Sequence, residues 1–238
     1  MLNDQDVERA LIITAHPDDL DFGAGGTIAS WVQKGVDVQY CICTDGDAGG
    51  FDPAVARSEI PGIRRAEQHA AGAMLGVKDI HFLGHPDGRL TPSIDLRRDI
   101  SRVIRQVRPQ RVLCQSPDRN YQRIYASHPD HLAAGEAALC AVYPDARNPF
   151  AHPELASEGH EAWSVAETWV MAGTQPTYGV DITEFFDLKI AALRRHVSQT
   201  EHMDDLEERM RDWATVQARA MGFPEGHLVE SFLIIDTV

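Results

Sequence analysis

The sequence predicts an α/β fold in which helices cover both faces of a mostly parallel central sheet. Short apolar segments alternate with amphipathic ones between residues 9 and 142, as in chains built from β-α-β units. The apolar segments are continuous, which is expected of strands buried on both faces. No repeat or linker divides the 238 residues. We therefore expect a single Rossmann-like domain over residues 1–238.

The first part of the chain supplies four strand and four helix predictions. The strands are runs rich in aliphatic and β-branched residues, at Arg9–Ala15, Val36–Thr44, Asp79–Leu83 and Gln110–Gln115. The helices carry apolar residues on one side, at Gly23–Gly35, Pro61–Gly76, Ile94–Val107 and Asp130–Val142. Pro61 suits a first helical turn, and Gly76 suits a helix end. The segment Asp45–Ile60 is predicted to be a loop.

The remaining chain is less regular. Periodicity fails between Pro144 and Trp163, which predicts a long ordered loop or cap, and we expect Asn148–Trp163 to shape the pocket. Later strands are predicted at Val165–Ala172, Tyr178–Ile182 and Leu228–Asp236, and later helices at Phe185–His196 and Asp204–Met221.

Composition and charge exclude several classes of partner. Lys and Arg total 22 against 36 Asp and Glu, a formal net charge of −14, and no dense basic run points to nucleic acid. No apolar run has the length of a membrane span, and no secretory signal is present, so we expect a cytoplasmic protein without a membrane partner. The four cysteines form no C-x-x-C pair, which favours free thiols over disulfides.

Aspartate and histidine concentrate directly after the predicted strands. The segments that follow the first four strands are HPDD at 16–19, TDGDAGG at 44–50, HPDG at 85–88, and 116–131, which ends in HPDH. Ligands of open α/β sheets bind at the carboxyl ends of the strands. The sequence therefore predicts one polar site at this edge of the sheet.

Two of these segments have the spacing of metal ligands. His16 and Asp19 lie three residues apart, as do His128 and His131, so each pair can point in one direction on a turn. Imidazole nitrogen and carboxylate oxygen suit a catalytic zinc site that keeps open positions. The same residue types suit iron(II), so they do not fix the metal.

Each motif also has a purely structural interpretation. Asp18 or Asp19 could cap the following helix, and His128-Pro129-Asp130 could begin one. A third unit, His85-Pro86-Asp87, could be a rival ligand set; we favour a turn in which Asp87 faces the substrate. The glycines from 23 to 26 lack the last glycine of a dinucleotide fingerprint, because Ile28 stands there.

The motifs together resemble the PIG-L/LmbE-like zinc-dependent N-deacetylase family, whose members include deacetylases of mycothiol and bacillithiol biosynthesis. The stretches that carry the resemblance are AHPDD at 15–19, GAGGT at 23–27, TDGDAGG at 44–50, Arg64-x-x-Glu67, Pro86-Asp87-Gly88 and HPDH at 128–131. Weaker similarity extends to Lys189, to His196-x-Ser198-Gln199 and to Glu230-Ser231-Phe232. The resemblance implies the LmbE-like deacetylase fold.

The resemblance also implies a role for individual residues. It makes His16, Asp19 and His131 metal ligands. It makes Asp18 the general base and His128 the group that stabilises the oxyanion. It makes Arg64, Asp87 and Asp47 contacts to a sugar-like substrate. One departure concerns a family tyrosine two residues before the first histidine of the second motif, where this chain has Ala126 and carries Tyr125 one position earlier.

The implied function is removal of an acetyl group from an N-acetylated sugar or conjugate of the N-acetylglucosaminyl type, with zinc, or Fe²⁺ or another divalent transition metal, as cofactor. Two alternatives stay open: an amidase that cleaves a thiol-sugar conjugate, such as a mycothiol S-conjugate, and a metal-retaining module without catalysis. Some members of the family form dimers or hexamers, so a homo-oligomer is also open.

Overall fold

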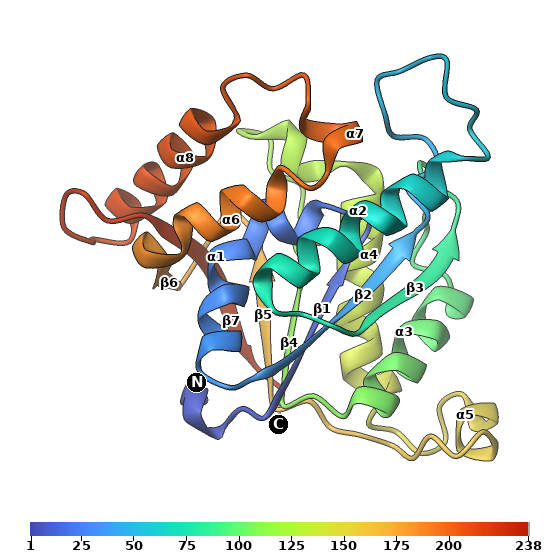
Figure 1. Ribbon diagram of the computed structural model, residues 1–238. Helices are drawn as coiled ribbons and strands as arrows, with labels where there is room; N and C mark the ends of the chain where they lie inside the picture. The colour runs from blue at the N-terminus through green and yellow to red at the C-terminus, as the bar shows by residue number, and fades with distance from the viewer. Residues whose placement is uncertain (238) are drawn as a thin grey trace.

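The computed structural model describes residues 1–237, which form a seven-stranded sheet in the order β3-β2-β1-β4-β5-β7-β6 (Figure 1). The strands are β1 (Arg9–Thr14), β2 (Asp37–Thr44), β3 (Ile80–His85), β4 (Arg111–Gln115), β5 (Glu167–Met171), β6 (Tyr178–Asp181) and β7 (Val229–Asp236). The first five are mutually parallel, and β7 pairs antiparallel with both β5 and β6. The predicted α/β class with a mostly parallel sheet is confirmed.

Helices cover both faces of this sheet (Figure 1). The α-helices are α1 (Asp19–Gln33), α2 (Ile60–Leu75), α3 (Ile94–Val107), α4 (Pro129–Cys140), α5 (Pro153–Ser157), α6 (Phe186–Leu193), α7 (Val197–Thr200) and α8 (Leu206–Ala220). Shorter turns are 3₁₀ at Asp4–Asp6, Ile124–Ser127 and Thr183–Phe185, and π-helical at Ala141–Asp145. Among residues 1–237, no helix combines the length and apolarity needed to cross a membrane.

Strand β1 forms the centre of the core. It is hydrogen-bonded to β2 on one side and to β4 on the other, and Leu11, Ile12 and Ile13 are fully buried. Because side chains alternate between the two faces of a strand, Leu11 and Ile13 pack on the side of α3 and α4, whereas Ile12 packs on the side of α1 and α2. This burial explains why the strand is continuously apolar.

Helix α1 begins four residues before the predicted Gly23. The glycines that suggested a start lie inside the helix, where they allow close packing. A Cβ at Gly26 would lie 2.6 Å from the Cβ of Ile182. The earlier start places Asp19 in the first helical turn, where the helix dipole stabilises a carboxylate.

The expectation that Asn148–Trp163 shapes the pocket is wrong. This segment contains α5 and lies at the end of the sheet opposite the carboxyl ends of the parallel strands (Figure 1). Arg105 donates to the carbonyl oxygens of Asn148 and Ala151, and the Trp163 indole donates to that of Pro109. These bonds secure the segment to the C-terminal end of α3.

Lys189 and Glu230, from the late stretches that resemble the family more weakly, form a buried ion pair. Lys189 Nζ lies 2.6 Å from Glu230 Oε1, and Glu230 also accepts hydrogen bonds from the backbone of Gly26 and Thr27. The pair therefore ties α6 and β7 to α1. The cysteines are free, as expected; Cys140 is half-buried and the others are buried.

Candidate active site

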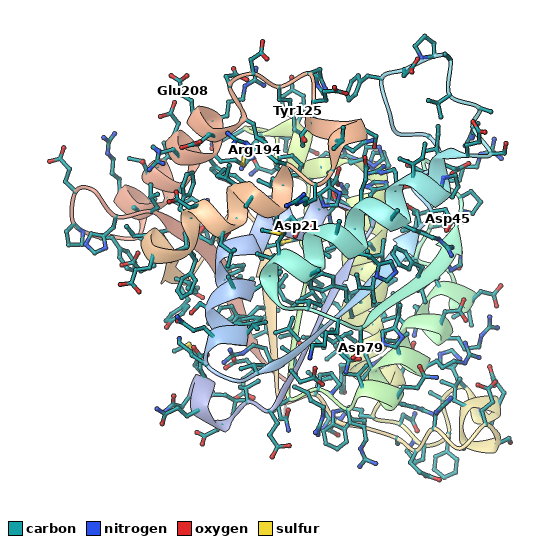
Figure 2. The ribbon with its side chains drawn as sticks, in the orientation of Figure 1. Asp21, Asp45, Asp79, Tyr125, Arg194 and Glu208 are labelled. Atoms are coloured by element: carbon teal, nitrogen blue, oxygen red, sulfur yellow. The ribbon has the colours of Figure 1, made fainter. Side chains whose placement is uncertain are left out.

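The loops that follow β1 to β4 meet at one edge of the sheet. Figure 2 shows Asp45, which follows β2, and Tyr125, from the loop after β4, at this edge, whereas Asp79 lies toward the opposite end. All eight residues predicted for the site belong to this edge or to the helices that begin there. The sequence prediction of a single polar site is supported by this placement.

Three histidines of the two central motifs face one another. The ring centroids of His16 and His128 are 5.0 Å apart, and His131 lies 5.3 Å from each of them. One ring nitrogen of each histidine lies within 4.8 Å of the others. Asp19 joins this group, because its Oδ2 lies 3.3 Å from His16 Nδ1 and its Oδ1 lies 3.0 Å from His131 Nε2.

A second group of three possible ligands shares His16. The Nε2 atom of His16 lies 3.0 Å from Asp87 Oδ1 and 3.3 Å from Asp130 Oδ2. A histidine that binds a metal usually donates its other N–H to a carboxylate. Donation from Nε2 to Asp87 or Asp130 leaves Nδ1 facing Asp19 and free to bind. The geometry therefore favours His16, Asp19 and His131 over His16, Asp87 and Asp130.

The charge around His16 fits a cation. Burial alone would lower the pKa of His16, yet the carboxylates of Asp19, Asp130 and Asp87 hold it well above its ordinary value. Three carboxylates converge here on one largely buried imidazole. Imidazole nitrogens and carboxylate oxygens in such an arrangement match the donor set of a divalent transition metal.

His128 can donate a hydrogen bond into the site. Its Nδ1 accepts the backbone N–H of Asp130 at 3.2 Å, an N-cap bond at the start of α4. Burial, followed by the charges of His16 and His131, lowers the pKa of His128 below its ordinary value. A neutral imidazole that accepts at Nδ1 carries its proton at Nε2. His128 is then a neutral donor at Nε2.

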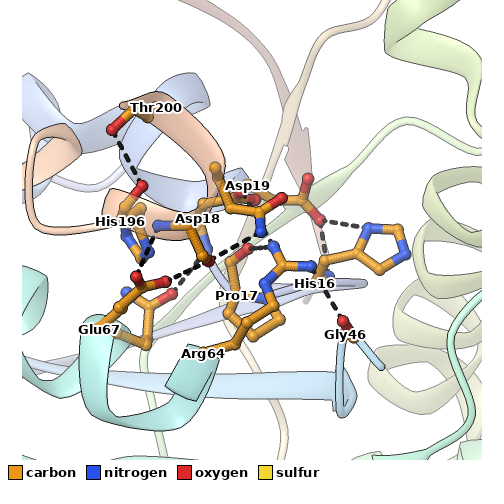
Figure 3. A network of polar contacts seen from close by, with 12 residues as sticks. His16, Pro17, Asp18, Asp19, Gly46, Arg64, Glu67, His196 and Thr200 are labelled. Carbon is orange, nitrogen blue, oxygen red and sulfur yellow. Dashed lines mark hydrogen bonds and ion pairs between the residues drawn. The ribbon is translucent and has the colours of Figure 1, made fainter. Parts of the chain in front are cut away.

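Asp18 is held at a strained turn beside the ligand group. Its φ is 90°, an uncommon value for a residue other than glycine, which typically costs about 1–3 kcal/mol. Its backbone N–H donates to Gln68 Oε1 at 2.8 Å, and Arg64 Nη2 donates to its Oδ2 at 3.0 Å (Figure 3). Burial raises the pKa of Asp18 to about 6, and Arg64 partly offsets that rise.

Arg64 reaches from α2 into this turn (Figure 3). Besides Asp18, its guanidinium donates to the carbonyl oxygens of Pro17 and Gly46, and the side chain is buried. The predicted substrate contact therefore has its main bonds within the protein. These bonds suit a residue that positions Asp18.

Of the other predicted substrate contacts, Asp87 lies against His16, and Asp47 contacts the backbone of Asp87. Asp87 accepts from the Ala48 backbone at 3.3 Å, and Asp47 Oδ1 accepts from the Asp87 backbone at 2.9 Å. Asp47 Oδ2 pairs with Arg57 at 2.8 Å. Each carboxylate oxygen has two lone pairs, so both side chains retain the capacity to accept a hydroxyl group.

Two residues of the site were missed in the sequence. Asp130 lies in the first turn of α4, as the structural interpretation expected, and it also contacts His16 and accepts the backbone N–H groups of Gly88 and Leu90. Gln68 binds the backbone of Asp18 and lies one helical turn after Arg64. That i, i+4 spacing was the available signal, because the two residues share one face of a helix.

A buried pair lies behind Asp18. His196 Nε2 is 2.8 Å from Asp21 Oδ2, both side chains are fully buried, and Gln68 also donates to Asp21. Burial would lower the pKa of His196, but Asp21 raises it above the ordinary value, with smaller contributions from Asp18 and Glu67. The protonated form of His196 therefore stabilises the folded protein.

This pair predicts a loss of stability at higher pH. The folded pKa of His196 exceeds the unfolded value, so its contribution is full below about pH 6.5 and disappears as pH rises through the folded pKa. His196→Gln should remove this component of the pH dependence. Urea unfolding from about pH 5.5 to 8.5 would measure it, and parallel curves for the two proteins would contradict the assignment. His196→Ala should cost about 3–5 kcal/mol, because it leaves the buried Asp21 carboxylate without its cationic partner.

A cavity of about 260 Å³ opens beside two of the candidate ligands. Asp19 and His131 contribute to its wall, together with Gln115 and Met171 from the ends of β4 and β5. A second cavity, of about 500 Å³, lies between the loop after β2 and α7. Of these two cavities, the candidate ligands line the first.

Comparison with known proteins gives consistent similarities. A family model described as PIG-L, GlcNAc-PI de-N-acetylase, matches residues 11–142. "Diacetylchitobiose deacetylase" of Thermococcus kodakarensis is 34% identical over 222 residues, 93% of this chain and 80% of that protein. "Probable N-acetyl-alpha-D-glucosaminyl L-malate deacetylase 2" of Bacillus cereus is 34% identical over 82% of this chain and 85% of that protein.

Solved structures show the same relationship. The N,N'-diacetylchitobiose deacetylase of Pyrococcus horikoshii superposes with a TM-score of 0.90 at 31% identity, and the match covers 98% of this chain and 85% of that one. The LmbE-like fold expected from the resemblance is therefore confirmed. The two polar motifs at residues 15–19 and 128–131 lie inside the range of the family model.

Proposed function

Since the chain belongs to the PIG-L family of de-N-acetylases, we propose that it hydrolyses the amide of an N-acetylated sugar of the N-acetylglucosaminyl type. It is an N-deacetylase, an enzyme that hydrolyses a carbon–nitrogen bond, and the relatives that carry this assignment are named as sugar deacetylases. The observation that carries the proposal is the convergence of Asp19 on His16 and His131, with Asp18 beside them.

We assign His16, Asp19 and His131 as the residues that would hold a divalent metal, with zinc as the first choice. Their nitrogen and oxygen donors fit zinc, and three protein ligands are typical of catalytic sites. A metal held there would supply Lewis acidity, polarising the acyl carbonyl and making water acidic enough to ionise near neutral pH.

Asp18 would act as general base. Its carboxylate takes a proton from the attacking water at an oxygen that Arg64 and the Gln68-bound backbone keep in place. A pKa of about 6 suits this role, because such a group is ionised at neutral pH and still accepts a proton readily. The carboxyl group then holds that proton until the departing amine takes it.

His128 would stabilise the negative charge that develops on the acyl oxygen. The proton on Nε2 is available because Nδ1 is engaged by the Asp130 backbone. A donor of this kind typically contributes about 10²–10³-fold to the rate. Asp47 and Asp87 would accept hydroxyl groups of the sugar from the side of β2 and β3.

The proposed function is tested by adding metal-loaded protein to N-acetylglucosaminyl compounds. We expect acetate and free amine to appear in equal amounts, and apoprotein prepared with a chelator to lack the activity until zinc is restored. Absence of acetate release from every N-acetylglucosaminyl compound, with the metal bound, would contradict the proposal and favour a module that retains metal without catalysis.

Arg64 gives a prediction that separates two roles. If Arg64 contacts the substrate, Arg64→Ala should chiefly raise KM. If Arg64 instead positions Asp18, the same substitution should chiefly lower kcat. Its bonds to Asp18, Pro17 and Gly46 lead us to expect the kcat effect, about tenfold or more. Steady-state kinetics measure both constants, and Arg65→Ala is the matched control, because Arg65 pairs with Asp45 instead. An unchanged kcat with raised KM would restore the substrate role.

A further inference from the structure

The 260 Å³ cavity beside Asp19 and His131 is not used by the mechanism above. Much of its wall is apolar, with Phe22, Gly23, Ala126, Met171, Met210 and Trp213 lining it, and Arg123 and Tyr125 also border the space. Met171 and Met210 are buried, and Arg123 lies with its guanidinium 3.8 Å above the ring of Trp213. An apolar space that borders proposed metal ligands is a natural place for an apolar part of the substrate.

The sheet order indicates which part of the substrate this is. Strand β1 lies between β2 and β4, so the turn with Asp18 and Asp19 has β2 and β3 on one side and β4 and β5 on the other. The proposed sugar contacts Asp47 and Asp87 follow β2 and β3. The cavity instead borders Gln115 and Met171, at the ends of β4 and β5.

A trans amide directs its two substituents away from each other. When the sugar on the amide nitrogen points toward β2 and β3, the acyl substituent on the carbonyl carbon points toward β4 and β5. It therefore enters the cavity. The methyl group of an acetyl would leave most of it empty, because one water-sized group needs only ~10–15 Å³ of such space.

The apolar part of this cavity can hold only a chain of limited length. The cavity adjoins a hollow of about 170 Å³, which shares Gly23, Ala126 and Trp213 but is also lined by Asn120, Gln217 and Ser231. An unbranched chain that reaches this hollow would remove water from polar side chains without offering a hydrogen bond in return, which is unfavourable. The wall is thus suited to a chain of intermediate length.

We propose that the enzyme accepts N-acyl sugars whose acyl chain is longer than acetyl, in the range from butanoyl to hexanoyl, and binds that chain in this cavity. The inference rests on the proposed function, because the same amide is cleaved. Water adds its oxygen to the acyl carbon, the C–N bond breaks, and the nitrogen leaves as the amine after gaining a proton. The products are the amino sugar and the fatty carboxylate.

The test compares methyl glucosaminides that carry acetyl, butanoyl or hexanoyl groups on nitrogen, with free amine as the readout. Each buried methylene is worth about fourfold, so kcat/KM should rise at least about tenfold from acetyl to hexanoyl. Met210→Trp fills the cavity and should reduce the ratio of hexanoyl to acetyl kcat/KM to near or below one. Val216→Trp, exposed on the same helix, should leave that ratio unchanged.

The outcomes distinguish the inference from the proposed function. Hydrolysis of the acetyl compound with slower hydrolysis of the longer ones overturns the inference and leaves deacetylation standing. Hydrolysis of none of these compounds overturns the inference, and the same result with every other N-acetylglucosaminyl compound overturns the proposed function as well. A preference for hexanoyl that Met210→Trp does not reduce places the chain elsewhere and also overturns the inference. If Met210→Trp fails to fold, Ala126→Leu fills the same cavity from the loop after β4.

Discussion

Asp18→Asn is expected to lower kcat by about 10²–10⁴-fold while the protein keeps its metal. Asparagine has nearly the same shape and tolerates the positive φ of this position, so the turn and the backbone bond to Gln68 should persist. What disappears is the carboxylate that takes the proton from water. Metal content by elemental analysis and steady-state kinetics on an N-acetylglucosaminyl compound measure the two effects separately.

Asp45→Asn provides the matched control for Asp18→Asn. Asp45 is a carboxylate at the same edge of the sheet (Figure 2). It pairs with Arg65 in a partly exposed position. Because a partly exposed pair of this kind contributes little, we expect kcat to change by less than about threefold. If the kcat of Asp18→Asn also changed by less than about threefold, Asp18 would not be the general base.

Asp19→Asn and His131→Gln are each expected to reduce metal affinity by more than about 100-fold. Loss of an outer hydrogen-bonding partner already costs about 10–100-fold, and a direct ligand should cost more. Asp19→Asn keeps an oxygen that can accept the backbone N–H of His16, so the turn after β1 is preserved. His131 lies on α4 and contacts that turn through Asp19 Oδ1, at 3.0 Å. Titration of the apoprotein with zinc measures both affinities.

Asp87→Asn distinguishes the two groups of ligands that share His16. With His16, Asp19 and His131 as ligands, Asp87 affects the metal only through His16, and its variant should bind zinc within about 10–100-fold of the original protein. If Asp87→Asn instead binds zinc more weakly than Asp19→Asn does, the metal would be assigned to His16, Asp87 and Asp130.

The candidate site was visible in the sequence because its chemistry is concentrated in short motifs. His16 and Asp19, like His128 and His131, are separated by one turn, so local spacing alone predicts that each pair shares a direction. The rule that parallel strands end at one edge then brings the motifs together. Residues such as Gln68 were missed because their role depends on a partner 50 positions away.

The role of Arg64 and the place of the segment Asn148–Trp163 also depend on contacts between residues far apart in the chain. Arg64 was expected to meet the sugar, yet its guanidinium lies among Asp18, Pro17 and Gly46, which only the packing of α2 against the sheet edge brings near. The segment Asn148–Trp163 carries polar residues suited to a pocket, but its bonds to Arg105 and Pro109 hold it at the far end. Composition carries no information about which end of a sheet a loop occupies.

The sequence by itself determined the fold class, the central strands and the polar motifs that meet at one edge of the sheet, because each of these follows from periodicity or from spacing within a few residues. The tertiary structure decided which nitrogen of His16 faces Asp19, what Arg64 binds, and where the apolar cavity lies. Those features arise where side chains from several elements converge. Their geometry is set by packing between residues far apart in the chain, which no local pattern encodes.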